Sequence, residues 1–336
     1  MAGYVLRRLL HAIPILAGVS LLVVLSAHLV PGSPGESFVG EKGTPEAIRA
    51  LNESIGWYDP LPVQWGRLVW GALRGDLGRS FATRRPVLDE LRERVPATVE
   101  LALAAFVIAL PLGLLLGAVA ALARRWPWSV LDHLTSTLAL AGISFPVFWL
   151  GLLLQIAIYP MQQRLSPLYT LEPVTGLYVL DALLAGDPAL VRDVLAHLAL
   201  PALALSTIPL AVIARMTRAA MREVLGQEFV RTARAKGLGP VRITLRHVLR
   251  NALVPVVTVT GIQFAALLGG AVLTETVFQW PGLGTYIVEA ASRKDLPALQ
   301  GAVLVVAVVF VAANLTVDLL YVALDPRIRA GLEGRR

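Results

Sequence analysis

Long apolar stretches alternate with polar connectors along the chain. Six of these stretches contain no Lys, Arg, Asp or Glu and reach the roughly 20 residues that a helix needs to cross a hydrocarbon core. They are residues 9–30, 101–123, 134–159, 195–214, 251–274 and 296–317. Lipid offers the backbone no hydrogen-bond partners, so each crossing must be helical. The pattern predicts an all-α integral membrane protein with six transmembrane helices, the last continuing to residue 324.

The first apolar stretch is expected to be a retained anchor. Arg7 and Arg8 precede it, as they would in a signal peptide. The stretch is longer than a signal-peptide core of about 7–15 residues, and no Ala-x-Ala cleavage site follows it. Residues 1–30 therefore form a cytoplasmic N-terminal segment and the first span.

The remaining chain divides at the same boundaries. Residues 31–98 form a loop on the outer side, and residues 99–324 form a core of five transmembrane helices. The core contains a polar loop, 215–250, on the cytoplasmic side, and residues 325–336 form a cytoplasmic tail.

The distribution of charge predicts the orientation, because cytoplasmic loops retain Lys and Arg. Loop 215–250 contains nine Lys or Arg and two acids, whereas the outer loop 31–98 contains nine basic and nine acidic residues. Both termini are therefore predicted to be cytoplasmic. The net charge of +7 is then a signal of topology, and no nucleic-acid partner is implied.

The composition excludes several kinds of site. Of the residues, 56% are hydrophobic and 16% are charged, and cysteine is absent, which rules out thiolate chemistry. No Gly-Lys-Ser/Thr sequence is present, so the chain carries no phosphate-binding P-loop. No two histidines lie within four residues of each other, and Ser144 has no predicted base. We therefore expect a protein that is not an enzyme and binds no cofactor or metal.

The outer loop carries helix signals. Thr44 followed by Pro45 is typical of an N-cap and a first helical residue, and Gly56 would end that helix. Residues 61–73 show helical spacing of apolar side chains, and residues 86–95 form a third piece before Pro96 resets the chain into the second span. Two interpretations stay open, a packed connector and a docking surface for an outer partner.

Polar and ionisable residues within spans are functional candidates because they are costly there. Asn314 and Asp318 lie near the inner end of the last span, and Asp132 lies before the third. Glu275 lies at the outer mouth of the fifth span, where water would relieve its burial. Bonding between helices and a proton relay are both compatible with these positions.

The loop after the fourth span contains the most informative segment. Residues 227–236 are good helix formers, with an acid first, basic residues last and Gly237 beyond, which matches dipole and C-cap preferences. Phe229, Val230 and Ala233 would form an apolar patch. From the pattern alone, this helix either lies on anionic lipid or docks into another protein.

The chain resembles the permease subunits of bacterial dipeptide and oligopeptide ABC importers, the binding-protein-dependent inner membrane component family. The resemblance rests on Arg-Thr-Ala-Arg-Ala-Lys-Gly-Leu at 231–238, Arg-Asn-Ala-Leu-Val-Pro at 250–255 and Leu-Thr-Glu-Thr-Val-Phe through Trp-Pro-Gly-Leu-Gly at 273–284. It also includes the start at residues 4–9 and the turn at 31–34. Where the general family pattern has Glu-Ala-Ala six residues before its glycine, this chain has Arg-Thr-Ala.

The resemblance implies a type I ABC importer permease fold in the bacterial inner membrane. The helix of residues 227–236 would sit in a cleft of a separate ATPase, which binds ATP and Mg²⁺. The coupling residues would be Glu228, Phe229, Val230, Arg231, Thr232, Ala233, Arg234, Ala235, Lys236 and Gly237. The candidate gate or outer mouth would comprise Glu275, Trp280, Pro281 and Gly282.

The resemblance also implies partners. Six spans form half of a pore, so a second homologous permease subunit would complete a heterodimer. One or two kinds of ATPase subunit and a periplasmic or lipid-anchored solute-binding protein would join it, within membrane lipid. The implied substrates are di- and oligopeptides, with nickel complexes, glutathione or oligosaccharides as alternatives. An ion-coupled secondary transporter would instead require inverted repeats and midplane charges, which the sequence lacks.

Overall fold

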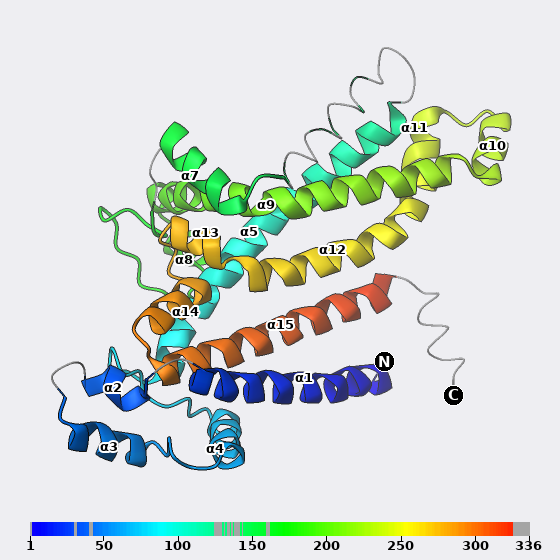
Figure 1. Cartoon of the computed structure of the whole chain (residues 1–336). Helices are drawn as coiled ribbons and strands as arrows, with labels where there is room; N and C mark the ends of the chain where they lie inside the picture. The colour runs from blue at the N-terminus through cyan, green and yellow to red at the C-terminus, as the bar shows by residue number, and fades with distance from the viewer. Residues whose placement is uncertain are drawn as a thin grey trace.

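The computed structural model describes residues 2–29, 32–39, 43–123, 130, 132, 135, 137, 142, 144–158 and 162–324, and these are mainly α-helical (Figure 1). Within them the β-structure is an isolated bridge between Arg79 and Pro86. The helices are α1 Ala2–Leu29, α2 Pro34–Val39, α3 Pro45–Ser54, α4 Leu61–Leu73, α5 Val87–Leu122, α7 Val147–Ala157, α8 Tyr178–Ala185, α9 Pro188–Leu225, α10 Glu228–Ala235, α11 Pro240–Ile243, the π-helix η1 Thr244–Leu249, α12 Arg250–Gly270, α13 Val272–Val277, α14 Leu283–Ser292 and α15 Leu296–Leu324.

Five helical segments are long and apolar enough to cross a membrane. They are Leu6–Leu29, Val87–Leu122, Pro188–Leu225, Pro240–Gly269 and Leu296–Leu319. The predicted third span, 134–159, lies partly outside the described residues, and its described part contains the 11-residue apolar helix α7. The structure therefore confirms five of the predicted spans by length and composition.

The second span begins earlier than predicted. The prediction that Pro96 separates a short helix from the span is wrong, because α5 runs through Pro96 and Pro111 without a break. A proline inside a helix costs a hydrogen bond. Here Val87 and Leu91 before Pro96, and Leu101 after it, are all buried, so one continuous face packs against the protein. We attribute the unbroken helix to this burial.

Among the described helices, α5 and α9 make the most extensive interface, and two glycines allow their close approach. Gly113 and Gly117 lie one turn apart on α5. A Cβ atom on Gly117 would lie 2.5 Å from the carbonyl oxygen of Ala214, and one on Gly113 would lie 2.9 Å from the Ile213 side chain. Small residues at this spacing are typical of tightly packed membrane helices.

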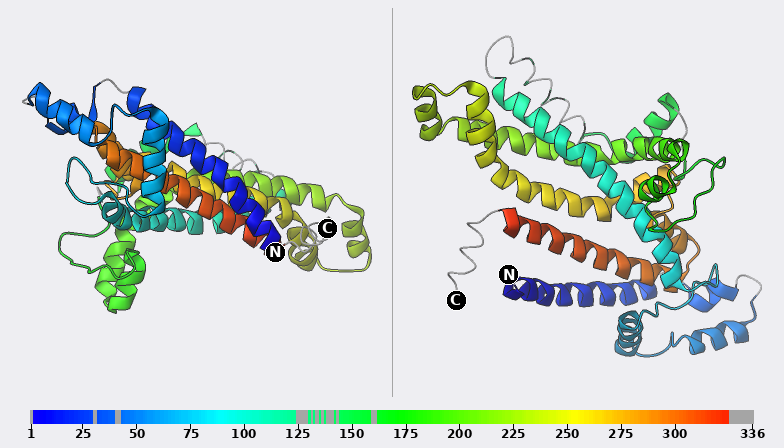
Figure 2. Two further views of the ribbon diagram at one scale, coloured as in Figure 1. Left: turned by 90° about the horizontal axis from the view of Figure 1, so that it is seen from below. Right: turned by 180° about the vertical axis from the view of Figure 1, so that it is seen from behind.

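The remaining long helices are arranged beside this pair. Figure 1 shows α12, α15 and α1 in succession, with α10 and α11 at one end of the bundle and α8, α13 and α14 at the other. Both views in Figure 2 show α1 and α15 side by side along their length, with the N-terminus of α1 near the C-terminal end of α15. The two ends of the bundle are called below the α10 end and the α13 end.

Helices α3 and α4 form as the sequence predicts, and α2 is a further short helix that the sequence pattern did not predict. The Thr44 hydroxyl accepts a hydrogen bond from the Ala47 amide at the start of α3, and Gly56 ends that helix with φ of +71°. The segment is tied to the first span, since Trp65 Nε1 donates to Ser20 Oγ at 2.9 Å and the His28 and Trp57 rings stack at 4.0 Å. These contacts support the interpretation as a packed connector.

Candidate functional site: a protruding helix and a buried hub

The helix α10 at the α10 end forms where the pattern predicts it. It starts after Gln227 and ends in a Schellman motif, in which Gly237 adopts φ of +78°. The Gly237 amide donates to the carbonyl of Arg234, and the Leu238 amide donates to the carbonyl of Ala233. These two bonds satisfy carbonyls that the helix end would otherwise leave unpaired. The helix is therefore short but sharply bounded.

The two faces of α10 differ from the predicted arrangement. Val230 is fully buried and Ala233 nearly so, packed in a cluster with Met221 and Val248 of the same chain. The prediction of one exposed apolar patch is wrong for these two residues, because their side chains complete the chain's own core. Phe229 is 39% exposed. The other exposed residues of this segment are Glu228, Arg231, Thr232, Arg234, Ala235, Lys236 and Gly237.

An ion cluster lies near the C-terminal end of α9, the helix that leads into α10. Arg218 Nε and Arg222 Nη2, both near the end of α9, donate to the Asp132 carboxylate at 2.6 and 2.7 Å. The hydrogen bond from Arg218 is the main reason that the pKa of Asp132 is lowered from 3.8 to about 2. The sequence singled out Asp132 but gave no indication of these partners, which lie more than 80 residues away along the chain.

At the α13 end, Glu275 is fully buried. The expectation that water relieves the cost of this carboxylate is wrong. The Thr98 hydroxyl donates to Glu275 Oε1 at 2.6 Å, and the Thr285 amide donates to Oε2 at 3.0 Å. Burial raises the pKa of the Glu275 carboxyl above its ordinary 4.5, against these hydrogen bonds, which lower it.

The other predicted mouth residues surround this carboxylate. Trp280 is fully buried, and its Nε1 donates to the Ala97 carbonyl at 2.9 Å. Gly282 lies so close that a Cβ atom there would be 2.3 Å from the Glu275 carboxyl group. Pro281 lines an open cavity of about 620 Å³ together with Arg94, Tyr178 and Gln279. Glu275, Trp280 and Gly282 are thus brought together within the packed protein, beside that cavity.

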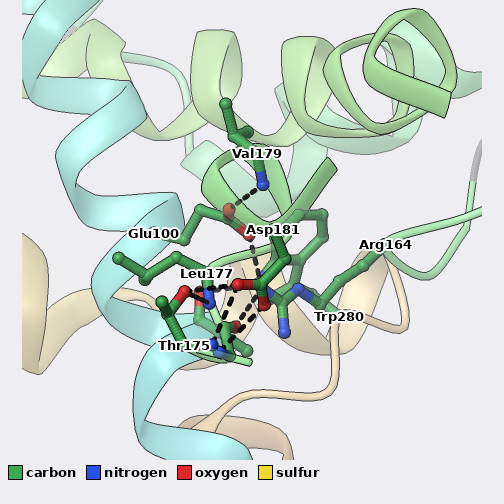
Figure 3. Close-up of polar contacts among 9 residues, drawn as sticks. Glu100, Arg164, Thr175, Leu177, Val179, Asp181 and Trp280 are labelled. Atoms are coloured by element: carbon green, nitrogen blue, oxygen red, sulfur yellow. Dashed lines mark hydrogen bonds and ion pairs between the residues drawn. The ribbon is translucent and has the colours of Figure 1, made fainter. Parts of the chain in front are cut away.

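Sequence reasoning missed a buried ion pair beside these residues. Arg164 Nη2 donates to Glu100 Oε2 at 2.5 Å, with the two side chains 4% and 6% exposed (Figure 3). The Val179 amide donates to the other Glu100 oxygen at 2.7 Å, and the Arg164 guanidinium lies 3.6 Å from the centre of the Tyr178 ring. Glu100 directly precedes the second apolar stretch, and this position was the only signal in the sequence.

One short segment of α5, residues 97–100, makes the hydrogen bonds that connect the elements of the α13 end. The Ala97 carbonyl accepts a hydrogen bond from Trp280, and the Thr98 hydroxyl donates one to Glu275. The Glu100 carboxylate accepts hydrogen bonds from Arg164 and from the Val179 amide. We call these seven residues the buried hub. It fixes the segment after the predicted third span, α8 and the α13–α14 turn against α5. Such an arrangement is suited to holding a shape, with no reacting group exposed in it.

The predicted polar pair in the last span lies elsewhere. Asn314 Nδ2 donates to the Phe310 carbonyl at 2.9 Å, and Asp318 Oδ1 accepts from Arg8 Nη2 of α1 at 3.0 Å. Of the two interpretations, the Asp318–Arg8 bond supports bonding between helices, because it joins α15 to α1, whereas the Asn314 bond lies within α15. Both residues line a cavity with Arg8.

Comparison with known proteins gives a consistent result. Residues 95–330 match the family model described as binding-protein-dependent transport system inner membrane component, and residues 1–102 match the model of its N-terminal part. The chain is 43% identical to the dipeptide transport system permease protein of Alkalihalophilus pseudofirmus, covering 98% of this chain and 100% of the relative.

Two further relatives cover similar lengths. The di/tripeptide transport system permease protein of Pseudomonas aeruginosa is 46% identical, over 98% of this chain and 99% of the relative. The glutathione transport system permease protein of Escherichia coli is 39% identical over the same shares.

Proposed function

This chain belongs to the binding-protein-dependent transport system inner membrane component family, and we propose that it is the permease subunit of an ATP-driven importer of di- and oligopeptides. The observation that carries this proposal is its similarity to peptide permeases over nearly the whole chain. Glutathione is a second candidate substrate, supported by the relative named for its transport. Uptake by the reconstituted importer tests both, with a labelled dipeptide and labelled glutathione supplied separately. Uptake of glutathione without uptake of dipeptide would contradict the peptide assignment.

We propose that α10 couples the permease to a separate ATPase chain, which supplies ATP hydrolysis. Three features support this role. Phe229, Arg231 and Arg234 are exposed, so they are available to a partner. Val230 anchors the helix in the chain's own core, so a force on α10 is passed to that core. Two residues, Gly226 and Gln227, join α10 to α9, and α11 and η1 join it to α12.

Co-purification with the ATPase tests this coupling. The variant Phe229→Asp places a charge on the exposed part of α10, and Tyr58→Asp, at a 62% exposed aromatic residue between α3 and α4, is the matched control. We expect the first variant to lose the ATPase while both elute as folded protein from a sizing column. Retention of an active ATPase by Phe229→Asp would contradict the role of α10.

We also propose the topology. The described part of the third apolar stretch would belong to a sixth span, both termini and α10 would be cytoplasmic, and α2–α4 and the buried hub would face the periplasm. The absence of cysteine from the sequence allows a direct test. A membrane-impermeant maleimide added to intact cells should label Tyr58→Cys and leave Gly239→Cys unlabelled. The reverse result would invert the orientation.

We propose that four residues form a rigid part of the outer opening of the pore, where a solute-binding protein would deliver peptide. They are Glu275, Trp280, Pro281 and Gly282. A second homologous permease would complete the pore. Trp280→Phe removes the bond to Ala97 and keeps most of the ring. We expect it to lower peptide uptake in proteoliposomes while ATPase binding persists. Unchanged uptake would exclude this contact from transport.

A further inference from the structure

A cavity between α1 and α15 is not used by the proposed transport function. It has a volume of about 270 Å³, and its lining includes Arg8, His11, Ile15, Phe310, Asn314 and Asp318. Arg8 directly precedes the uncharged stretch 9–30, and Asp318 directly follows the uncharged stretch 296–317. The cavity therefore opens at the boundary of the apolar layer, where the head groups of membrane lipids lie.

The lining of this cavity changes from polar to apolar with depth. Arg8 and Asp318 form its rim. Ile15 lies seven residues beyond Arg8 and Phe310 eight residues before Asp318, which at 1.5 Å per residue is about 10–12 Å deeper. Ile15 and Phe310 are 55% and 42% exposed, so the apolar part of the groove is open to the surroundings. A molecule with a polar head and a hydrocarbon chain matches this gradient.

The charges of the rim indicate the kind of head group. Arg8 and Asp318 are ion-paired, with side chains 48% and 26% exposed, so both groups remain accessible. The Arg8–Asp318 pair has no net charge. An anionic head group would be attracted to the Arg8 guanidinium but repelled by the Asp318 carboxylate. A zwitterionic head group with a primary amine complements both, because its phosphate faces the guanidinium and its ammonium can donate hydrogen bonds to the carboxylate.

We propose that this cavity binds a zwitterionic aminophospholipid, with the phosphate at Arg8, the ammonium at Asp318 and an acyl chain along Ile15 and Phe310. The bound lipid would join the first span to the last at the side of the membrane where the chain starts and the last span ends. The proposal depends on the cavity and its charges and holds for either orientation of the protein.

Native mass spectrometry of the full chain tests the proposal. The protein is released from nanodiscs that contain equal amounts of phosphatidylethanolamine, phosphatidylglycerol and phosphatidylcholine. We expect wild type to retain phosphatidylethanolamine at least several-fold over the other two. Asp318→Asn should remove the preference over phosphatidylcholine, and Arg8→Gln should lower retention of all three. Asp59→Asn, in an ion pair with Arg67 outside the spans, is the matched control and should behave as wild type.

A series of lipids keeps the test independent of whether the variants fold. Stepwise methylation of the ethanolamine nitrogen removes hydrogen-bond donors while the charge stays. Retention by wild-type protein should fall with each methyl group. Equal retention across the series, or a preference for phosphatidylglycerol, would overturn the proposal.

Discussion

The two ends of the bundle use polar residues in opposite ways. At the α13 end, Glu100, Arg164 and Glu275 are buried and bonded within the chain. At the α10 end, Arg231 and Arg234 are exposed, and the charge cluster of Asp132 lies only partly buried at the base. The first end is built to keep its internal geometry, and the second presents charge to its surroundings.

This difference indicates how much the charged residues at each end contribute to the stability of the fold. A buried ion pair costs desolvation, so it persists only when its geometry is complete, and losing one partner leaves an uncompensated charge. Exposed charges carry little stability and leave the fold unchanged when altered. Substitutions at the α13 end should therefore affect folding, while those at the α10 surface should affect partners.

The largest expected effect comes from breaking the buried ion pair. Arg164→Ala leaves the Glu100 carboxylate buried without its cation, which should destabilise the fold by about 3–5 kcal/mol. Arg49→Ala removes an exposed partner of Glu53 and should leave the melting temperature nearly unchanged. Thermal unfolding of both purified variants in detergent measures the contrast. Similar melting temperatures would show that the buried pair does not hold this end together.

A pair of glycines sharpens the same comparison at a smaller scale. Gly282→Ala places a methyl group 2.3 Å from the Glu275 carboxyl group, so the hub must shift, at a cost of about 1–3 kcal/mol. Gly239→Ala, beside α11, meets no atom within 4 Å and has an ordinary negative φ. Its unfolding should match wild type in the same thermal assay. A tolerated Gly282→Ala would mean that the hub is loosely packed.

The sequence was sufficient where structure follows local pattern. Helix α10 carries an acid at its start, basic residues at its end and a glycine at position 237, all within a dozen residues. The apolar runs likewise identify five spans by length. Such features depend on neighbours along the chain, so composition and spacing reveal them.

The buried hub could not be predicted in this way, because the residues that bond to each other in it are distant along the chain. Glu100 and Arg164 are 64 residues apart, and Thr98 and Glu275 are 177 apart. Nothing near Glu100 indicates that its carboxylate turns inward. For the same reason, the exposed apolar patch predicted on α10 was partly wrong, since the core that covers Val230 includes residues of α9 and η1.

The pH dependence of stability should have opposite signs at the two ends. The pKa of Asp132 is lowered from 3.8 to about 2 in the folded protein. The resulting stability is present above pH 3.8 and is lost as the pH falls toward 2. The melting temperature of wild type minus that of Asp132→Asn should therefore shrink between about pH 4 and 2. A constant difference would mean that Asp132 has no such ion pairs in solution.

For Glu275 the sign reverses. Its pKa is raised above 4.5 by burial, so the folded protein binds the proton more tightly than the unfolded chain. The contribution is present below pH 4.5 and is lost as the pH rises through the folded value. The melting temperature of wild type minus that of Glu275→Gln should fall as the pH is raised from 4.5. A rise instead would indicate a cation paired with this carboxylate.

The smallest expected effect on stability separates two adjacent residues of α10. Phe229 is 39% exposed, and Phe229→Ala should change the free energy of unfolding by no more than about 0.5 kcal/mol, as surface substitutions do. Val230 is fully buried, so Val230→Ala removes about two buried methylene equivalents, roughly 1.6 kcal/mol before any cavity cost. Denaturant unfolding measures both. If Phe229→Ala were as costly as Val230→Ala, the aromatic ring would belong to the chain's own core, and α10 would offer a partner charge alone.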